Sequence, residues 1–227
     1  MSKRKTTKDG QIYTCDDQGV VHQLYYDLYN YDKEYVQTYD TPEYKQASEV
    51  LNNIRFAFVC GALGREPNSI LDFGYGNGDF LKVAHRHGVN AVGFDVTGVE
   101  IEGITTYKDT LPEKVGREVV TFWDAIEHVE FMKTVINADF CPYFVAVTVP
   151  CLPIPFSNDR FEDVFSDWKH RKPNEHLHHF TPLSLKLFMQ KQGYKLLSLC
   201  HIEDYVRVSE TKPNTVTAFF VREDAYL

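Results

Sequence analysis

The sequence predicts an α/β protein with a mostly parallel sheet and helices on both faces. Two observations support this prediction: short apolar segments alternate with helical segments from residue 69 onward, and glycine or proline marks most boundaries. Such alternation favours parallel strands, because each helix carries the chain back across one face of the sheet. The 227 residues suffice for one good-sized core with a modest extension.

Each predicted element has a local signal. Thr41 and Pro42 are suitable as N-cap and first residue of a helix, and Val50, Leu51, Ile54 and Phe58 recur at helical spacing before residues 61–68 end it. Helices are also predicted over 80–87 and from Pro182 to Gly193. Predicted strands span residues 69–73, 91–96, 103–107, 118–123, 143–149, 196–200 and 215–221. The last two strands are expected to pair antiparallel at one edge.

Composition limits the class of protein. The formal net charge of −8 argues against non-specific nucleic-acid binding. The five cysteines are scattered without a CxxC pair, which favours free thiols in a reducing compartment and therefore a cytoplasmic location. The longest apolar run, residues 143–156, contains three prolines, so we expect no membrane helix.

A glycine-rich turn lies between the first predicted strand and its helix. In Asp72-Phe73-Gly74-Tyr75-Gly76-Asn77-Gly78, the glycines would let backbone N–H groups approach a ligand. A dinucleotide fold prefers GxGxxG, whereas Asp79 occupies its third small position. Asp72 is placed to meet an ammonium group, directly or through water. Asp95, at the end of the next strand, matches a carboxylate that holds both ribose hydroxyls, although it could simply cap the turn.

These segments resemble one enzyme family. Residues 71–80 (LDFGYGNGDF) resemble motif I of class I S-adenosylmethionine (SAM)-dependent methyltransferases, and residues 92–96 (VGFDV) resemble their second motif. Residues 119–129 (VVTFWDAIEHV) and 176–194 are similar to segments of the ubiquinone-type and small-molecule branch. The resemblance implies a Rossmann-like, doubly wound, seven-stranded sheet with its last strand antiparallel.

The resemblance also implies a SAM site over the C-terminal strand ends. It assigns Gly74, Gly76 and Gly78, with the neighbouring Tyr75, to the methionine and ribose side, and Asp95, with Val96, to the ribose. Trp123 and Asp124 would lie beside the methionine half or the substrate. Relatives often carry Asp where this chain has Glu118, so no adenine contact is assigned.

Histidines are the candidates for proton removal, because imidazole titrates near neutral pH. We select His128, His176 and His178, and strict alternation would place the last two on one side of an extended segment. Asp124, Glu127 and His128 would share a helical face and could bind a divalent ion. They could equally serve capping and hydrogen bonding, so no metal ligand is assigned.

The sequence therefore predicts a SAM-dependent methyltransferase that acts on oxygen or nitrogen of a small molecule. Two alternatives remain open: an RNA-terminal 2′-O-methyltransferase, and a catalytically silent SAM-binding regulatory module. We expect residues 1–66 to form a tail and a tyrosine-rich helical lid, and residues 67–227 to form the methyltransferase domain. In the lid, Tyr35 and Tyr39 lie one helical turn apart and could face a sulfonium or simply pack.

Overall fold

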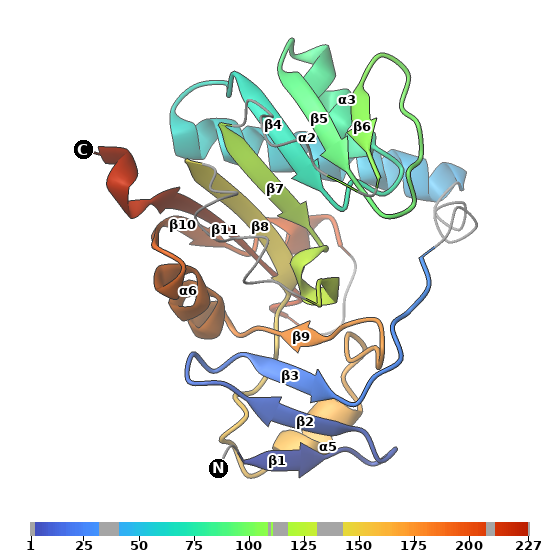
Figure 1. Ribbon diagram of the computed structural model, residues 1–227, viewed down its shortest axis with the longest axis vertical. Helices are drawn as coiled ribbons and strands as arrows, with labels where there is room; N and C mark the ends of the chain where they lie inside the picture. The colour runs from blue at the N-terminus through green and yellow to red at the C-terminus, as the bar shows by residue number, and fades with distance from the viewer. Residues whose placement is uncertain are drawn as a thin grey trace.

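The computed structural model describes residues 3–31, 41–108, 110, 118–130, 143–207 and 212–226, which form two β-sheets (Figure 1). The larger sheet has the strand order β10-β11-β8-β7-β4-β5-β6. Only β11 runs against the other strands. The predicted mostly parallel sheet with an antiparallel pair at one edge is confirmed. Its strands are β4 (Ser69–Phe73), β5 (Asn90–Phe94), β6 (Thr105–Tyr107), β7 (Val119–Trp123), β8 (Phe144–Pro150), β10 (Tyr194–Cys200) and β11 (Thr215–Arg222).

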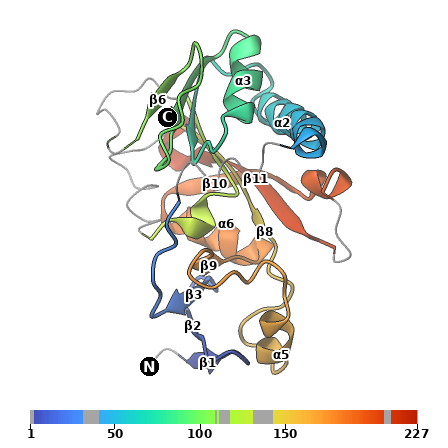
Figure 2. The same ribbon diagram turned by 90° about the vertical axis from the view of Figure 1, so that its right-hand side faces the viewer.

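Helices cover both faces of this sheet, as predicted (Figure 2). On one face, α2 (Pro42–Leu63) and α3 (Asp79–Arg86) pack against alternate strand residues such as Ile70 and Val119. On the other face, α6 (Pro182–Lys191) packs against Leu71 and Val120. Successive residues of β4 and β7 therefore point into two separate cores, which explains why these strands read as continuous apolar runs.

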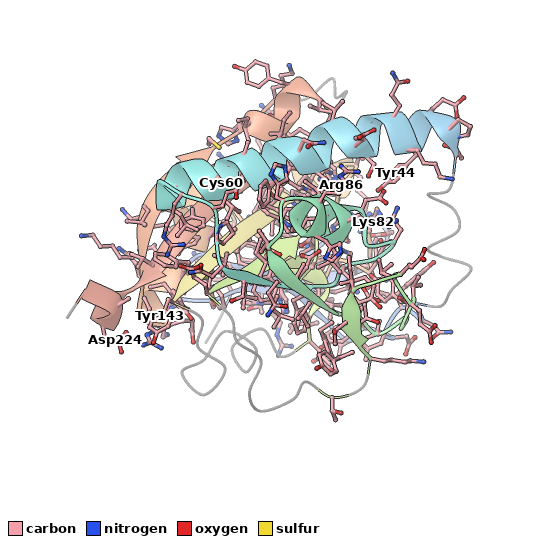
Figure 3. All side chains as sticks on the ribbon, turned by 90° about the horizontal axis from the view of Figure 1, so that it is seen from above. Tyr44, Cys60, Lys82, Arg86, Tyr143 and Asp224 are labelled. Atoms are coloured by element: carbon pink, nitrogen blue, oxygen red, sulfur yellow. The ribbon has the colours of Figure 1, made fainter. Side chains whose placement is uncertain are left out.

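The long helix α2 begins and ends where the sequence predicts, but it buries a different face. Thr41 accepts a hydrogen bond from the Tyr44 N–H (3.2 Å), and Gly64 ends the helix in the left-handed conformation. Figure 3 shows Tyr44 and Cys60 toward opposite ends of α2. The predicted apolar face is wrong in part, because Val50 is half exposed. The buried residues also follow helical spacing, and the first three of them are polar: Ser48, Asn52, Arg55, Phe56 and Val59.

The N-terminal residues form a second, smaller sheet rather than the predicted tail. Its antiparallel order is β1-β2-β3-β9, with β1 (Arg4–Thr6), β2 (Ile12–Cys15), β3 (Val21–Leu24) and β9 (His178–His179). Helix α5 (Phe161–Ser166) packs against it beside β1 and β2 (Figure 1). The tail prediction is wrong because β1 reads as a polar RKT triplet, and the apolar residues that pack under this sheet come largely from the distant segment 152–168.

Aromatic side chains form the core under the small sheet. The Tyr13 ring meets Phe165 edge-on at 4.9 Å, and Phe161 stacks on Phe165 at 4.7 Å. The buried members come from both segments: Tyr13, Val21, Leu152, Phe156, Phe161, Phe165 and Trp168. The segment after β8, which contains prolines and aromatics, thus folds together with the N-terminus. The division of the chain at residue 66 stays a prediction.

Three short 3-10 helices complete the described structure: η1 (Ile126–His128), η3 (Ile202–Tyr205) and η4 (Glu223–Tyr226). Between β3 and α2, the described residues 25–31 are not helical, so the predicted helix is present only from Pro42 onward, and its role as a lid stays a prediction. Tyr35 and Tyr39 lie outside the described residues. No helix within the described ranges has the length and apolar character needed to cross a membrane.

Candidate active site

The glycine-rich loop connects β4 to α3 and adopts a backbone that only glycine holds without strain. Gly74, Gly76 and Gly78 all have positive φ angles of 78°, 56° and 75°. A Cβ on Gly74 would lie 2.7 Å from the Ala125 Cβ, so this glycine is also needed for close packing. A Cβ on Gly76 would meet no atom within 4 Å. The middle of the loop is therefore open to a ligand.

Asp72 lies beneath this loop, near the end of β4. Its carboxylate is almost fully buried and accepts a hydrogen bond from the Thr121 hydroxyl (2.6 Å). Burial raises the pKa of Asp72 to about 7, although the Thr121 hydrogen bond and the Arg55 charge oppose this shift. A cationic ligand group would favour the ionised form of this carboxyl.

Asp95 follows β5 and lies beside the same loop. One carboxylate oxygen accepts from the Gly76 N–H (2.9 Å), and the other accepts from the Thr97 N–H (2.8 Å) and hydroxyl (2.6 Å). Asp95 therefore caps its own turn and lies against the loop, and its contact with a ribose stays a prediction. The oxygen that accepts from Gly76 keeps a lone pair for a further donor, whereas both lone pairs of the other oxygen are used by Thr97. Its neighbour Val96 is exposed.

Tyr75 contributes its backbone to the loop but its ring to the core. The ring packs against Gly93, where a Cβ would come within 2.5 Å of a ring carbon, and the hydroxyl donates to the Val99 carbonyl. Trp123 is similarly buried, with its ring edge-on to Phe80 at 5.2 Å. Its indole N–H has no hydrogen-bond partner among the described residues.

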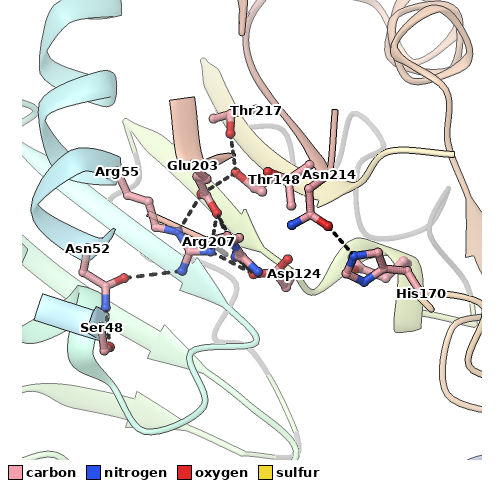
Figure 4. Close-up of polar contacts among 12 residues, drawn as sticks. Ser48, Asn52, Arg55, Asp124, Thr148, His170, Glu203, Arg207, Asn214 and Thr217 are labelled. Carbon is pink, nitrogen blue, oxygen red and sulfur yellow. Dashed lines mark hydrogen bonds and ion pairs between the residues drawn. The ribbon is translucent and has the colours of Figure 1, made fainter. Parts of the chain in front are cut away.

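Asp124 ends β7 at the centre of a buried charge network (Figure 4). Its backbone has a positive φ of 52°, unusual for a residue with a side chain. Its carboxylate accepts from Arg55 of α2 (2.8 Å) and from Arg207. Burial opposes ionisation, but the charges of these two arginines hold the pKa of Asp124 well below its usual range.

Glu203 of η3 completes the network. It is fully buried and accepts hydrogen bonds from Arg55 Nε (2.8 Å), Arg207 Nε (2.8 Å) and the Thr148 hydroxyl (2.8 Å). Two guanidinium groups and two carboxylates therefore balance one another at the ends of β7 and β8. Asp124 and Arg207 are the more exposed members of the network, with side-chain exposures of 30% and 25%.

Sequence reasoning missed Arg55, Glu203 and Arg207. Arg55 carries a signal in hindsight, because Ser48, Asn52 and Arg55 follow helical spacing on the face of α2 that turns out to be buried. Glu203 and Arg207 carry no such signal, since only the tertiary fold brings η3 over the end of β7.

His128 and His176, both predicted, lie together. Their rings meet edge-on with centroids 4.6 Å apart, and burial lowers the pKa of each, that of His176 to about 2. Glu127 lies beside them with its Oε1 3.9 Å from the His128 Nε2. The three residues form the one group of potential metal ligands in the described part of the chain.

His178 lies outside this group, so the expectation that it shares a side with His176 is wrong. The chain turns at residues 172–176, where the His176 N–H donates to the Lys172 carbonyl (2.8 Å), and alternation starts only at β9. Both nitrogens of His178 have partners: the Val129 carbonyl (2.9 Å) and the Nδ1 of His22 (2.8 Å). Its surroundings indicate a structural role.

The loop, the acidic strand ends and the histidines all lie at the C-terminal edge of the parallel strands, where α/β sheets bind ligands. Residues 43–199 match the family model described as "Methyltransferase domain". The chain belongs to this methyltransferase family. No curated protein matches the methyltransferase in sequence.

Solved structures share the fold of this methyltransferase at low identity. The Burkholderia thailandensis 1,6-didemethyltoxoflavin-N1-methyltransferase, solved with its substrate and S-adenosylhomocysteine, is 13% identical with a TM-score of 0.57, over 98% of this chain and 100% of that one. The Synechocystis magnesium protoporphyrin IX methyltransferase, solved with S-adenosylhomocysteine, is 11% identical with a TM-score of 0.53, over 80% and 87%. The small RNA methyltransferase HEN1 is 16% identical with a TM-score of 0.50, over 81% of this chain and 25% of that one.

Family and fold together identify a class I SAM-dependent methyltransferase. The residues at the strand edge fit this cofactor. A Cβ would fill the open space at Gly76, and the buried carboxylate of Asp72 and the partly exposed carboxylate of Asp124 suit a ligand with an ammonium and a sulfonium charge. The ubiquinone-type branch stays a prediction.

Proposed function

We propose that the methyltransferase transfers the methyl group of SAM to an oxygen or nitrogen of a small molecule in the cytoplasm. The observation that carries this proposal is the pair of buried, neutral imidazoles of His128 and His176 beside the glycine-rich edge of the sheet. A sulfonium supplies the electrophilic methyl, so the protein has to position the acceptor, exclude water and receive a proton.

In this proposal the cofactor lies across the ends of β4, β5 and β7. The Gly76 region and Asp95 hold the ribose, with Val96 beside it, and Gly74, Gly78 and Tyr75 contribute backbone to the same loop. Asp72 lies below the loop as a counter-charge, and Trp123 supports the site from the core. The role of each residue is a proposal.

Arg55 and Arg207 suit the amino-acid end of the cofactor. That end carries an ammonium and a carboxylate, so it is a zwitterion. It can enter the ion pair between Asp124 and the two arginines without changing the net charge of the site. Asp124 would then accept from the ammonium, and a guanidinium would donate to the carboxylate.

The proposal assigns release of the acceptor proton to the cluster around His128 and His176. His128 is positioned by the Glu175 carbonyl, which lies 2.8 Å from its Nδ1. A carbonyl can only accept, so the proton resides on Nδ1 and the Nε2 lone pair is directed away from it. In the same scheme His178 supports the site by holding the Val129 carbonyl rather than by contacting the acceptor.

RNA is the alternative acceptor, since HEN1 is a small RNA methyltransferase of similar fold. Residues 169–172 (KHRK), just before the histidine cluster, form a basic loop that could contact RNA phosphates. Arg171 pairs with Asp9 (3.0 Å), and Lys172 pairs with Glu175 (2.9 Å), so two of its charges are already compensated. The net charge of −8 also favours a small acceptor.

Calorimetric titration tests the cofactor and the acceptor chemistry separately. We expect micromolar binding of S-adenosylhomocysteine, its loss in Asp95→Ala, and no binding of NAD. Transfer to a panel of small hydroxyl and amine acceptors, and to a 3′-terminal RNA oligonucleotide, then identifies the acceptor class. In His128→Asn we expect transfer to fall at least tenfold with cofactor affinity kept; unchanged transfer would remove His128 from the mechanism. Absence of transfer to every acceptor would favour a silent SAM-binding module.

A further inference from the structure

Glu127, His128 and His176 converge on one point although they come from two distant segments. Glu127 and His128 belong to η1 at the end of β7, and His176 lies in the turn before β9. One ligand-type atom from each residue lies within 4.8 Å of the other two. The Leu177 N–H donates to the Glu127 carbonyl (2.9 Å) and fixes the two segments against each other.

The Glu127 carboxylate is the most unusual member of this group. It is 1% exposed, and neither of its oxygens has a hydrogen-bond partner in the described structure. A buried carboxylate without a donor is strongly unfavourable. Burial, followed by the Asp124 charge, raises the pKa of Glu127 well above its usual value. A nearby positive charge would remove this penalty.

The imidazoles of His128 and His176 do not provide this positive charge, because burial lowers the pKa of both and keeps them neutral. The His128 Nδ1 lies 2.8 Å from the Glu175 carbonyl and 2.6 Å from the Tyr31 hydroxyl, so it carries the proton and Nε2 is a bare acceptor. This Nε2 faces the Glu127 Oε1 at 3.9 Å. The buried Nδ1 of His176 also has no partner within the described ranges of the chain. The His128 Nε2 and the Glu127 carboxylate therefore face each other as acceptors, and the described residues place no donor between them.

We propose that Glu127, His128 and His176 bind one divalent cation. Two imidazole nitrogens and one carboxylate oxygen suit a first-row ion such as Zn²⁺ better than Mg²⁺, which prefers oxygen ligands. The Glu175 carbonyl is the outer partner that typically orients a ligating histidine. Zinc bonds of about 2.0–2.2 Å require the three ligand atoms to move closer together than they are now.

The structure changes the ligand set that the sequence left open. Asp124 shares the DAIEH segment with Glu127 and His128, but its carboxylate is held by Arg55 and Arg207. His176, which lies 48 residues after His128 in the sequence, replaces Asp124 in the proposed ligand set. Three protein ligands leave a further coordination position on the ion. This step rests on the proposed function: an acceptor oxygen would bind there, and the ion would lower the pKa of the acceptor hydroxyl. His128 then acts as a ligand rather than as a base.

Zinc titration of the metal-free protein tests the site without any methyl transfer. We expect calorimetry to give one Zn²⁺ per chain with micromolar or tighter affinity. Glu127→Gln and His176→Asn should each weaken binding at least tenfold, whereas His85→Asn, which changes an exposed histidine, should bind as the wild type does. Absence of zinc binding, or equal binding by all variants, would overturn the proposal.

Two further measurements keep the test decisive. Long-range ¹⁵N–¹H spectra of the wild type should show zinc-dependent shifts at ring nitrogens of two histidines only, which needs no variant to fold. S-adenosylhomocysteine binding, measured on the same samples, reports the cofactor site. Zinc binding without cofactor binding would contradict the proposed function but support the metal site. Cofactor binding without a histidine shift would support the proposed function but contradict the metal site.

Discussion

Asp72 shows how a single buried carboxyl links stability to cofactor binding. In the described part of the chain, Thr121 is the one hydrogen-bond donor to this carboxylate, and the residue is almost completely removed from water. Such a group is favourable only while it is neutral or has a cationic neighbour. The residue is therefore better suited to the cofactor-bound protein than to the free one.

The first prediction concerns the stability of Asp72→Asn against pH. Because the pKa of Asp72 is raised from 3.8 to about 7, the folded protein keeps a proton that the unfolded chain releases between these values. The wild type should lose stability as pH rises through this window, by about 2–4 kcal/mol for this group. Denaturant unfolding at pH 5 and pH 8 measures the free energy of unfolding of both proteins. The stability of Asp72→Asn relative to the wild type should be higher at pH 8 than at pH 5. The exposed control Asp27→Asn should show no such gain.

The second prediction separates two glycines of the loop. Gly76→Ala adds a methyl group in open space, so it should destabilise by only about 1–2 kcal/mol through its positive φ. The same methyl should block the cofactor and weaken S-adenosylhomocysteine binding at least tenfold. Gly74→Ala meets the Ala125 Cβ and should unfold at a markedly lower temperature. Calorimetry with thermal melts checks both, and normal binding by Gly76→Ala would place the cofactor elsewhere.

At the scale of elements, the sequence predicts what is encoded locally. Thr41-Pro42, Thr181-Pro182 and the glycines after each helix mark boundaries that the structure reproduces closely. The small sheet was missed because β1 and β9 are too short and polar to show a pattern, and because β9 pairs with β3, which lies far away in the sequence. For the same reason Asp72 and Asp95 could be selected from motifs, whereas Glu203 could not.

The third prediction tests how η3 is attached to the sheet. Glu203→Gln should destabilise the protein by about 3 kcal/mol, because two buried guanidiniums lose a shared counter-charge. The control Glu118→Gln breaks an ion pair with the half-exposed Arg65 and should change stability by at most about 1 kcal/mol. Urea unfolding of both variants provides the comparison. Equal effects would mean that the network contributes little to holding η3.

At the scale of the whole molecule, the two sheets share backbone and side-chain contacts. Strand β9 pairs with β3, while its neighbour Leu177 donates to the Glu127 carbonyl beside the large sheet. Leu152 donates to the Phe180 carbonyl (2.7 Å), and Val20, next to β3, belongs to the core under α6. The segment that carries His176 is therefore held between the two sheets.

The last prediction follows from these shared contacts: the two sheets should unfold together. The chain has two tryptophans, Trp123 in the large core and Trp168 in the small one, so each single-tryptophan variant reports one sheet by fluorescence. In Trp123→Phe and in Trp168→Phe, we expect the urea midpoint measured by fluorescence to equal the midpoint measured by circular dichroism on the same variant. Phe165→Ala removes a fully buried ring from the small core and should lower the free energy of unfolding by about 3–5 kcal/mol. The urea midpoints reported by both tryptophans should therefore fall together. An early fluorescence transition at Trp168 alone would show that the small sheet unfolds independently, and the histidine cluster would then lose its support before the cofactor site does.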